Sequence, residues 1–537
     1  MTATGGGEAR RSEGGLLAGL IGAAVATGGM LAVGFASDQP TIAETVADGI
    51  ARVTPLETVE HMTATFGESA KHLLFATVLV GEVALGAILG VIHARRRWSA
   101  IKSFTALSAL VTLVALGVAL VALPALGEGV LGARSRAGAG GTLFSLLATA
   151  ALFVLGYVAA DHALNPTGLF AVEEAASRRA FVTKTIIAGG GLVVGIGAFQ
   201  WLAEHLTPGA GSAASGEALR TNAALAGAGD LVEALANGVP GLSPEITPNE
   251  KFYVVSKNVL RDPVVNEQTW RLEVAGLVNR PMTLTYEDVK ALPAASQYFT
   301  LQCISNAVGG SLIGNAEWRG IRLSALLGQA GVKAGAVDVV LRAADDYVDS
   351  IPIQKAMESG TMLAYEMNGE VLPKAHGFPV RLLVPDIYGM KNVKWITKIE
   401  VIEYDLKGYW QTKGWDDTAT MHTTSRIDIP KNGSNLLAGQ SFVGGIAVAG
   451  SRGIRKVEVS TDGGGSWGPA TIKPALGPDS WVLWLYPWEL SAGEAEPRRI
   501  LVRATDGTGV LQTSVVSDAL PAGSSGYHAI TVRRAEA

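Results

Sequence analysis

Five apolar segments crowd into the N-terminal part of the chain, and they constrain its fold more than any other feature. They cover about 14–37, 73–92, 103–127, 137–160 and 185–203. A helix of about 20 apolar residues can cross the hydrocarbon core of a bilayer. Only 17% of the 537 residues are charged, and the mean hydropathy of +0.29 is too high for an ordinary soluble enzyme. The sequence therefore predicts a five-helix transmembrane domain over 1–204 in a multi-pass membrane protein.

Charges in the loops between these segments predict the orientation. Basic residues lie before the first segment, after the second and before the fifth, whereas the loop after the first segment is acidic. Arg134 and Arg136, after the third segment, are one mild exception. Under the positive-inside rule the N-terminus is cytoplasmic and everything after the fifth segment is extracytoplasmic. The run SRRAFVTK at 177–184 resembles a twin-arginine export signal, or it is a plain basic anchor; both interpretations predict this topology.

Three polar residues within or just beyond the apolar segments leave functional alternatives open. Glu82 lies near the middle of the second segment, where a carboxylate is costly. It serves either proton transfer or quinone contact, or it is a protonated, hydrogen-bonded structural residue. His93 and His162 fall near the inner ends of their segments and could bind haem, but histidines at membrane interfaces are common. A structural role is therefore favoured over haem.

The remainder of the chain divides by composition into three parts. Residues 205–248 are rich in Gly, Ala and Pro and read as a linker, with a short helix between Glu217 and Asn237. Over 249–412 alternating strands mix with short helices, which indicates an α+β domain. Over 413–537 short strands alternate with Gly/Asp turns, which is typical of an all-β sandwich of immunoglobulin type. Its tryptophans, Trp467, Trp481, Trp484 and Trp488, are expected in the core.

Cys303 is the only cysteine of the chain, so it cannot form an intramolecular disulfide. It is either a small buried hydrophobe or a residue kept for its sulfur. Apolar and β-branched residues lead into it, and Gly309 and Gly310 break the pattern just after it. A thiolate at a strand end beside a turn suits a soft metal.

Two motifs resemble the sulfite oxidase family of molybdenum enzymes. LQCISN at 301–306, followed by AEWRGIRLSALL, is similar to the cysteine segment of that family, and HGFPVRLLVPDIYGMKNVKWITKIEV at 376–401 is similar to its pterin-binding segment. The resemblance covers roughly 245–535. It implies a molybdopterin-binding oxidoreductase domain over 249–412 that binds molybdenum–molybdopterin (Mo-co). It also implies that 413–537 is a dimerisation domain, so a homodimer is expected.

The resemblance also implies roles for individual residues. Cys303 would be the metal ligand, with Lys257 and Tyr409 as further catalytic candidates. An acidic pterin contact aligns with either Asp345 or Asp346. Arg381 would clamp the phosphate end of the pterin, because a guanidinium fork matches phosphate geometry. The full set of cofactor-binding candidates is Ser256, Lys257, Asn258, Cys303, Asp345, Asp346, His376, Arg381, Asn392, Val393 and Lys394.

The resemblance gives a substrate class and a type of electron partner, but no single compound or protein. The resemblance implies oxygen-atom transfer on a small oxyanion or a sulfoxide, with electrons exchanged with a separate cytochrome or quinone. Where the family has arginines near its site, this chain has Ala307 and Val308, Lys257, and the run ALPAG at 519–523. Lys257, Arg319 or Arg426 are the replacements to consider. A net charge of −5 predicts no nucleic-acid partner. An inactive binding protein and a membrane-coupled sensor remain as alternatives.

Overall fold

The computed structural model describes most of the chain. The described residues are 5–37, 40–55, 58, 62, 69–94, 100–133, 135, 138–164, 230–259, 261–436, 439–490 and 497–534. The chain divides into two compact units. A helical unit combines Met1–Ala210 with the short segment Asn258–Asp262, and a second unit combines Gly211–Lys257 with Pro263–Ala537.

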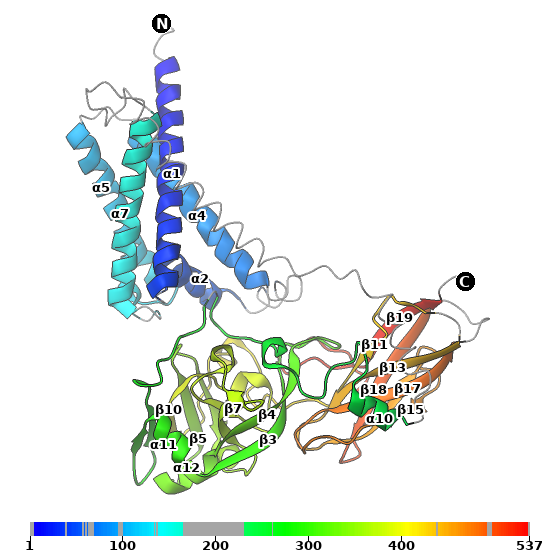
Figure 1. Cartoon of the computed structure of the whole chain (residues 1–537). Helices are drawn as coiled ribbons and strands as arrows, with labels where there is room; N and C mark the ends of the chain where they lie inside the picture. Colours follow the sequence, from blue (N-terminus) through cyan, green and yellow to red (C-terminus); the bar gives the residue numbers. More distant parts are fainter. Residues whose placement is uncertain are drawn as a thin grey trace. The chain divides into compact units, whose positions relative to one another are not determined.

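Four helices of the helical unit are long and apolar enough to cross a membrane (Figure 1). They are α1 (Gly5–Ser37), α4 (Ser69–Ala94), α5 (Ala100–Gly117), which continues through a π-helical turn into α6 (Leu123–Ala125), and α7 (Gly138–Leu164). These agree with the first four predicted segments. The fifth segment, 185–203, and the run 177–184 lie outside the described residues. A shorter amphipathic helix, α2 (Ile42–Val53), follows α1.

Glycines set the packing of α1 against its neighbours α4 and α7. A Cβ on Gly19 would lie 2.3 Å from the carbonyl oxygen of Gly86, and one on Gly90 would lie 2.1 Å from that of Gly15. On the other side of α1, a Cβ on Gly22 would lie 2.9 Å from the backbone nitrogen of Tyr157. Such close approach of backbones is how helices gain packing energy where lipid removes the hydrophobic driving force. The roles considered for Glu82, His93 and His162 stay predictions.

Two sheets form the first domain of the second unit, as the α+β prediction requires. One has the strand order β2-β1-β10-β5-β6 and the other β3-β4-β7-β8, with β9 paired to β7. The strands are β1 (Leu272–Gly276), β2 (Met282–Leu284), β3 (Ala294–Gln302), β4 (Ile313–Arg322), β5 (Asp338–Ala343), β6 (Val348–Pro352), β7 (Met362–Met367), β8 (Glu370–Val371), β9 (Arg381–Leu383) and β10 (Ile396–Ile402). The helices between them are α11 (Tyr286–Ala291), α12 (Leu323–Ala330) and α13 (Ile353–Ala356).

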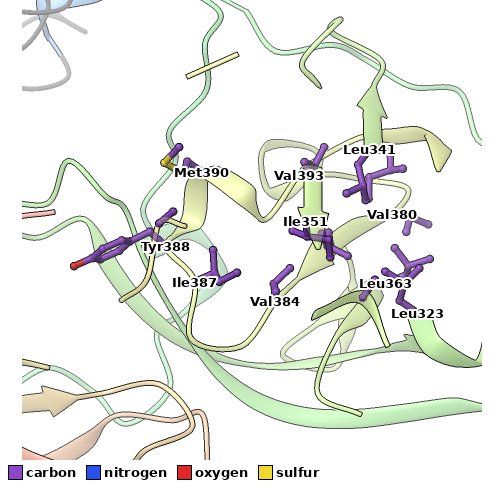
Figure 2. Close-up of a cluster of buried hydrophobic side chains, with 14 of the residues drawn as sticks. Leu323, Leu341, Ile351, Leu363, Val380, Val384, Ile387, Tyr388, Met390 and Val393 are labelled. Atoms are coloured by element: carbon purple, nitrogen blue, oxygen red, sulfur yellow. The ribbon is translucent and has the colours of Figure 1, made fainter. Parts of the chain in front are cut away.

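Aliphatic side chains from both sheets and from the loop after β9 fill the core of this domain. Figure 2 shows Leu341 and Ile351 from the first sheet meeting Leu363 from the second. Tyr388 borders the cluster, and its hydroxyl points away from the labelled aliphatic side chains (Figure 2). The core thus holds the loop that carries Tyr388 in place, and the Tyr388 hydroxyl lies outside the aliphatic cluster.

The C-terminal domain consists of two further sheets, of order β11-β13-β17-β16 and β12-β19-β18-β14-β15. The strands are β11 (Thr424–Ile429), β12 (Asn435–Leu436), β13 (Gly439–Val448), β14 (Ile454–Ser460), β15 (Gly468–Pro469), β16 (Thr471–Ile472), β17 (Val482–Leu490), β18 (Arg498–Asp506) and β19 (His528–Arg534). Residues of both sheets share one core, centred on the buried Trp484. The immunoglobulin type of this sandwich stays a prediction.

Trp467 differs from the other three tryptophans of this domain. Trp481, Trp484 and Trp488 are buried, as expected. Trp467 is only partly buried, with its ring edge-on to Tyr527 and the Arg503 guanidinium 4.1 Å from its centroid. The reason is its position in the loop before β15, where an arginine stacked on the ring takes the place of a core.

The described structure before residue 249 belongs to the second unit, so the predicted boundary at 249 lies inside that unit. Helix α10 (Leu231–Asn237) starts at the capping residue Asp230, and Leu235 is buried in the core. The backbone oxygen of Glu245 accepts hydrogen bonds from Asn315, at 2.9 Å, and from the Trp481 indole, at 3.0 Å. The last part of the predicted linker, 230–248, is therefore part of the domain rather than a tether.

Candidate active site

Cys303 comes directly after β3, at the start of a tight loop that returns to β4. Its side chain is 8% exposed, and its Sγ lies 3.0 Å from the hydroxyl of Ser305. Asn306 holds the loop closed, because its side-chain oxygen accepts the backbone N–H of Leu312 at 2.9 Å. Gly310 is required here, since a Cβ would lie 2.5 Å from that same oxygen. The fold thus presents one sulfur at a fixed strand end.

Tyr253 links the cysteine loop to the basic segment downstream. A Cβ on Gly389 would lie 2.7 Å from the Tyr253 hydroxyl and 3.3 Å from the backbone oxygen of Gln302, the residue before Cys303. Burial raises the pKa of Tyr253, Cys303 raises it further, and Arg381 opposes both. The phenol therefore stands between a thiol and a guanidinium and stays protonated at neutral pH.

Arg381, the first residue of β9, carries the main positive charge of the site. It is 5% exposed, donates to the backbone oxygens of His376 at 3.0 Å and Asn392 at 3.3 Å, and lies 5.1 Å from the Trp318 ring centroid. Its Nε has no acceptor, and no carboxylate of the described residues pairs with it. Burial lowers the pKa of Arg381 to about 10, so it remains charged at neutral pH.

His376 lies beside this arginine but faces the protein interior. Its Nε2–H donates to the backbone oxygen of Asn249 at 2.8 Å, and its ring stands edge-on to Phe252 at 5.5 Å. Burial lowers the pKa of His376 to about 4, and Arg381 and Lys394 contribute to that shift. The imidazole is therefore neutral, and it fixes the turn that carries Arg381.

Gly377 draws Arg381 and Lys394 together. At φ +116° it adopts a conformation that favours glycine, and a Cβ there would lie 3.0 Å from the Cβ atoms of both basic residues. Lys394 itself donates to the backbone oxygen of Ala375 at 3.0 Å and lies 4.1 Å from the Trp395 ring centroid. The predicted basic pair thus comes together around one turn.

Asn392 and Val393 form hydrogen bonds within the loop between β9 and β10 and do not present exposed polar groups. The Asn392 side chain accepts from Val384 at 2.7 Å and donates to Ile387 and Tyr388. Val393 is buried, and its backbone oxygen accepts the N–H of Leu382 at 2.8 Å. Both residues brace the loop between β9 and β10.

Asp345 and Asp346 form the turn between β5 and β6. Asp345 is buried and accepts the N–H of Tyr347 at 3.1 Å, whereas Asp346 is exposed and has φ +62°. Of the two aligned alternatives, only Asp345 points into the domain. Its contact with a pterin stays a prediction.

The remaining candidates lie in different surroundings. The Lys257 ammonium lies 6.0 Å from the Tyr409 ring centroid, and that ring is 5.9 Å from Tyr347. The structure therefore brings Lys257 and Tyr409 together. Ser256 precedes them and is half-buried. Asn258 belongs to the helical unit, where its amide donates to Asp262 at 3.1 Å.

Sequence reasoning missed a buried ion pair next to Tyr347. Lys391 is 2% exposed and donates to Asp349 at 3.1 Å and to the backbone oxygen of Ser350 at 2.9 Å. The Tyr347 hydroxyl lies 2.9 Å from the other Asp349 oxygen. Burial raises the pKa of Asp349 while Lys391 opposes the rise. A lysine and an aspartate 42 positions apart give no local signal in the sequence.

Two arginines that could have replaced the missing guanidiniums are already paired. Arg319 is largely exposed and bridges Glu366 at 2.8 Å. Arg426 binds Asp428 at 2.7 Å, and it also donates to the backbone oxygen of Gly310 in the cysteine loop at 2.8 Å. Arg426 therefore supports the loop around Cys303, and Arg319 does not belong to the site.

The donor set fits a molybdopterin. Nowhere in the described parts of the chain do three or more His, Cys, Asp or Glu side chains gather as a metal site. Cys303 is the soft ligand of the site, and it could hold a metal whose other ligands come from a cofactor. The unpaired Arg381 Nε offers a buried donor for the anionic end of such a group.

Comparison with known proteins identifies the family. Residues 259–410 match the model of the oxidoreductase molybdopterin binding domain. The mitochondrial sulfite oxidase of Drosophila melanogaster is 34% identical over 301 residues, covering 47% of this chain and 52% of its own length. That of Homo sapiens is 31% identical over 318 residues, covering 50% and 58%. The chain spans about half the length of these relatives.

Two further comparisons extend to bacteria. The sulfane dehydrogenase SoxCD of Paracoccus pantotrophus is a solved structure with 26% identity and a TM-score of 0.47, over 54% of this chain and 81% of that chain. The uncharacterized oxidoreductase YuiH of Bacillus subtilis (strain 168) is 36% identical over 146 residues, which are 27% of this chain and 72% of YuiH. The chain therefore belongs to the family of molybdenum oxidoreductases that share the molybdopterin-binding domain.

Proposed function

We propose that this protein is a membrane-anchored, Mo-co-dependent oxidoreductase that transfers an oxygen atom to or from a small sulfur compound outside the cytoplasm. The family and the sulfite oxidase relatives support the chemistry. Four apolar helices and the charge pattern of their loops support the anchoring and the sidedness.

The observation that carries the proposal is the buried guanidinium of Arg381, which has no carboxylate partner among the described residues. Arg381 and Cys303 both interact electrostatically with the Tyr253 hydroxyl. A buried charge that lacks a partner destabilises a fold by several kcal/mol, on the order of magnitude of breaking a buried ion pair. Arg381 has no such partner among the described residues, and its Nε lacks any acceptor. An anionic ligand would satisfy it, and the pterin phosphate is the one that the family implies.

The chain's own residues then have distinct tasks. When bound, Mo-co supplies a metal that exchanges one oxygen atom and two electrons with the substrate. Cys303 would hold the metal, and the Tyr253 hydroxyl would donate a hydrogen bond within the site. Lys257, beside Tyr409, is the cation left to attract an anionic substrate. Asp345, Lys394 and the loop 387–393 would enclose the pterin, and His376 would fix its phosphate-binding turn.

A substrate panel with a dye mediator tests the proposal. It should include sulfite and several sulfoxides and should compare wild type with Cys303→Ser, and molybdenum per chain should be measured alongside. Because the sulfur is the protein's metal ligand, we expect about one molybdenum per chain in wild type and loss of turnover in Cys303→Ser. Met357→Ser is the matched control, since it removes an exposed sulfur from the same unit. Full turnover in Cys303→Ser would sink the proposal.

Reduction of an uncharged sulfoxide is the second candidate. Arg319 and Arg426 are both paired with carboxylates, which leaves Lys257 without a guanidinium neighbour for a doubly charged anion. Such a pocket suits a neutral oxygen donor better than it suits sulfite. The direction of the reaction in the same panel separates the two. A cytochrome or a quinone as electron carrier, and a homodimer through the C-terminal domain, complete the proposal.

A further inference from the structure

The loop from Cys303 to Leu312 is closed partly by its own hydrogen bonds and partly by the C-terminal domain. Within the loop, the N–H of Cys303 donates to the backbone oxygen of Leu312 at 2.9 Å, and the N–H of Asn306 donates to that of Cys303 at 3.1 Å. The backbone oxygens of Asn306 and Gly310 instead accept from side chains 218 and 116 residues away. These side chains belong to the C-terminal domain, which lies in the same compact unit.

Arg426, on β11, makes the contact with Gly310. Its Nη1 donates to the backbone oxygen of Gly310 at 2.8 Å. Its Nε donates to Asp428 at 2.7 Å, and its Nη2 donates to the hydroxyl of Ser243 at 2.8 Å. The Arg426 and Asp428 side chains are only 13% and 6% exposed. A planar guanidinium bound at three points has one orientation, so the backbone at Gly310 is fixed along with it.

Ser524, in the loop before β19, makes the contact with Asn306. Its hydroxyl donates to the backbone oxygen of Asn306 at 2.6 Å. Asn306 also closes the loop through its side chain, which accepts the N–H of Leu312 at 2.9 Å. Because the N–H of Asn306 donates to the backbone oxygen of Cys303, a restraint on Asn306 also restrains the cysteine.

His528, the first residue of β19, packs directly on the same loop. Its Nδ1 accepts the backbone N–H of Ile427 at 2.9 Å, so its Nε2 carries the proton. A Cβ on Gly309 would lie 2.3 Å from that Nε2, and Gly309 has a φ of +80°. A side chain at position 309 would therefore meet the imidazole and also strain the backbone. The glycine allows the C-terminal domain to pack against the cysteine loop without a gap.

The serine that follows Ser524 has a different role. The Ser525 hydroxyl lies 2.8 Å from that of Ser517 and donates to the backbone oxygen of Val515 at 2.7 Å. Both of these partners belong to the C-terminal domain itself. Two adjacent serines thus divide between the interior of their own domain and the loop that carries Cys303.

We propose that the C-terminal domain sets the position of the Cys303 sulfur, with Arg426 and Ser524 as positioning residues that act through the loop 303–312. Ligands of a metal keep their geometry only when the residues behind them are fixed. The restraint on the loop does not depend on the proposed function, whereas its effect on turnover does. The C-terminal domain then has a task within each chain, in addition to the dimerisation that the resemblance implies.

Thiol labelling of the full-length protein, made without molybdate and purified in nanodiscs, tests the restraint directly. Cys303 is the chain's only cysteine and is 8% exposed, so a small maleimide reports on the opening of this loop alone. We expect labelling about three- to tenfold faster in Ser524→Ala than in wild type, because the loop opens more readily without that hydrogen bond. Arg426→Met should accelerate labelling at least as much. It also removes the partner of Asp428, so Ser524→Ala is the decisive variant.

Ser525→Ala is the matched control, since it removes a hydroxyl that bonds only within the C-terminal domain. Arg503→Met serves in the same way for Arg426→Met, because Arg503 pairs with Glu458 at 3.1 Å inside that domain. Both controls should label at the wild-type rate. Unchanged labelling in Ser524→Ala overturns the proposal. Equal acceleration in both serine variants overturns it as well, because a general loosening of the C-terminal domain would then be the cause.

The loaded protein gives a second readout, which rests on the proposed function. A displaced sulfur overlaps differently with the metal, so the thiolate-to-molybdenum absorption band of Ser524→Ala should shift at equal molybdenum content. With the substrate found in the panel, kcat should fall about threefold or more and KM should stay within about twofold, since substrate binding is untouched. An unchanged band, or a rise in KM alone, would overturn the positioning role. If no substrate turns over, the proposed function fails, and the labelling experiment still decides on the restraint.

Discussion

At the scale of single residues, the site is defined by charges that the protein itself leaves unbalanced. Arg381 is buried beside a neutral histidine and a protonated tyrosine, and no described carboxylate forms an ion pair with it. Lys391 is equally buried, but it forms an ion pair with Asp349 at 3.1 Å. The contrast separates a buried cation without a carboxylate partner from a paired one, and burial alone would not have done so.

Replacing Arg381 should therefore affect loading and stability in opposite directions. Arg381→Met is expected to lower molybdenum per chain at least tenfold, because the proposed phosphate site loses its buried positive charge and the free Nε–H donor. It should also stabilise the cofactor-free protein by about 1–4 kcal/mol, because an unpaired buried charge is removed. Metal analysis and thermal unfolding of protein made without molybdate measure the two effects. Arg319→Met, at the surface, should change both within error, and full loading of Arg381→Met would contradict the assignment.

His376 gives a pH dependence with a defined sign. Its pKa is about 4 in the fold and about 6.5 when unfolded, so below pH 6.5 the unfolded chain binds a proton that the fold does not. Its contribution to stability is present above pH 6.5 and is lost as pH falls towards 4, by up to about 3 kcal/mol. His376→Gln should flatten this part of the stability profile in denaturant titrations between pH 7 and 4. Asp479, whose pKa burial raises to about 6, acts in the opposite sense in both proteins and cancels in the comparison. An unchanged slope would contradict the prediction.

The sequence predicted the residues with a local motif and missed those that act at a distance. Cys303, Arg381 and Lys394 were found from two short segments, and the structure places Arg381 and Lys394 around one glycine. Tyr253 was missed because an aromatic residue in FYVVSKN reads as core until its hydroxyl is seen beside Gly389. Asn258 was a candidate because the segment 252–258 resembles one that touches the pterin in the family. Its amide donates to Asp262 at 3.1 Å, and its contact with a pterin stays a prediction.

At the scale of elements, the pairing of β4 with β7 holds the strand that follows the cysteine loop. Gly320 lies at a register shift between the two strands, where a Cβ would lie 2.0 Å from the backbone oxygen of Leu363. Trp318, two residues earlier, is fully buried and stacks under Arg381. The bulge therefore helps to set the position of Trp318, whose ring packs against the Arg381 guanidinium.

A side chain at position 320 should consequently destabilise the whole second unit. Gly320→Val is expected to destabilise the second unit by about 2–3 kcal/mol or more, since the clash is with backbone and cannot be relieved by a rotamer change. Denaturant unfolding measures it. Gly328→Ala in α12 meets nothing within 4 Å and should stabilise by about 0.5–1 kcal/mol as a helix substitution. Equal effects at both glycines would contradict the role of the bulge.

Alternation and turn residues were enough to predict the α+β domain and the strand-rich C-terminal part. The boundary at 249 was placed too late, because the Ala- and Gly-rich stretch before it looks like a tether. Its polar backbone is used by Asn315 and Trp481, which lie 70 and 236 positions away. Composition cannot reveal hydrogen bonds over such separations.

At the scale of the whole molecule, the chain combines four helices that are long and apolar enough to cross a membrane with a domain of a family that the comparisons identify. Five apolar helices were predicted because a membrane span needs about 20 apolar residues. Four of them are present, and the fifth, 185–203, lies outside the described residues. Sidedness depends on loop charges alone and stays a prediction.

Cell fractionation tests the anchor and its orientation. The full-length protein should remain with membranes after high-salt and alkaline carbonate washes, because apolar helices resist both. Protease added to intact spheroplasts should cleave the C-terminal domain and leave a tag at the N-terminus uncut until the membrane is opened. A cytoplasmic control protein must survive the same treatment. Release by carbonate, or protection of the C-terminal domain, would contradict the topology.

The Arg381 guanidinium, which has no carboxylate partner among the described residues, also affects how the protein matures in the cell. A chain that has not received its pterin carries a bare cation in its interior and opens more readily than a finished one. Quality-control proteases act on such openings. Cells starved of molybdate are therefore expected to hold less of this protein altogether, rather than a normal amount that is idle.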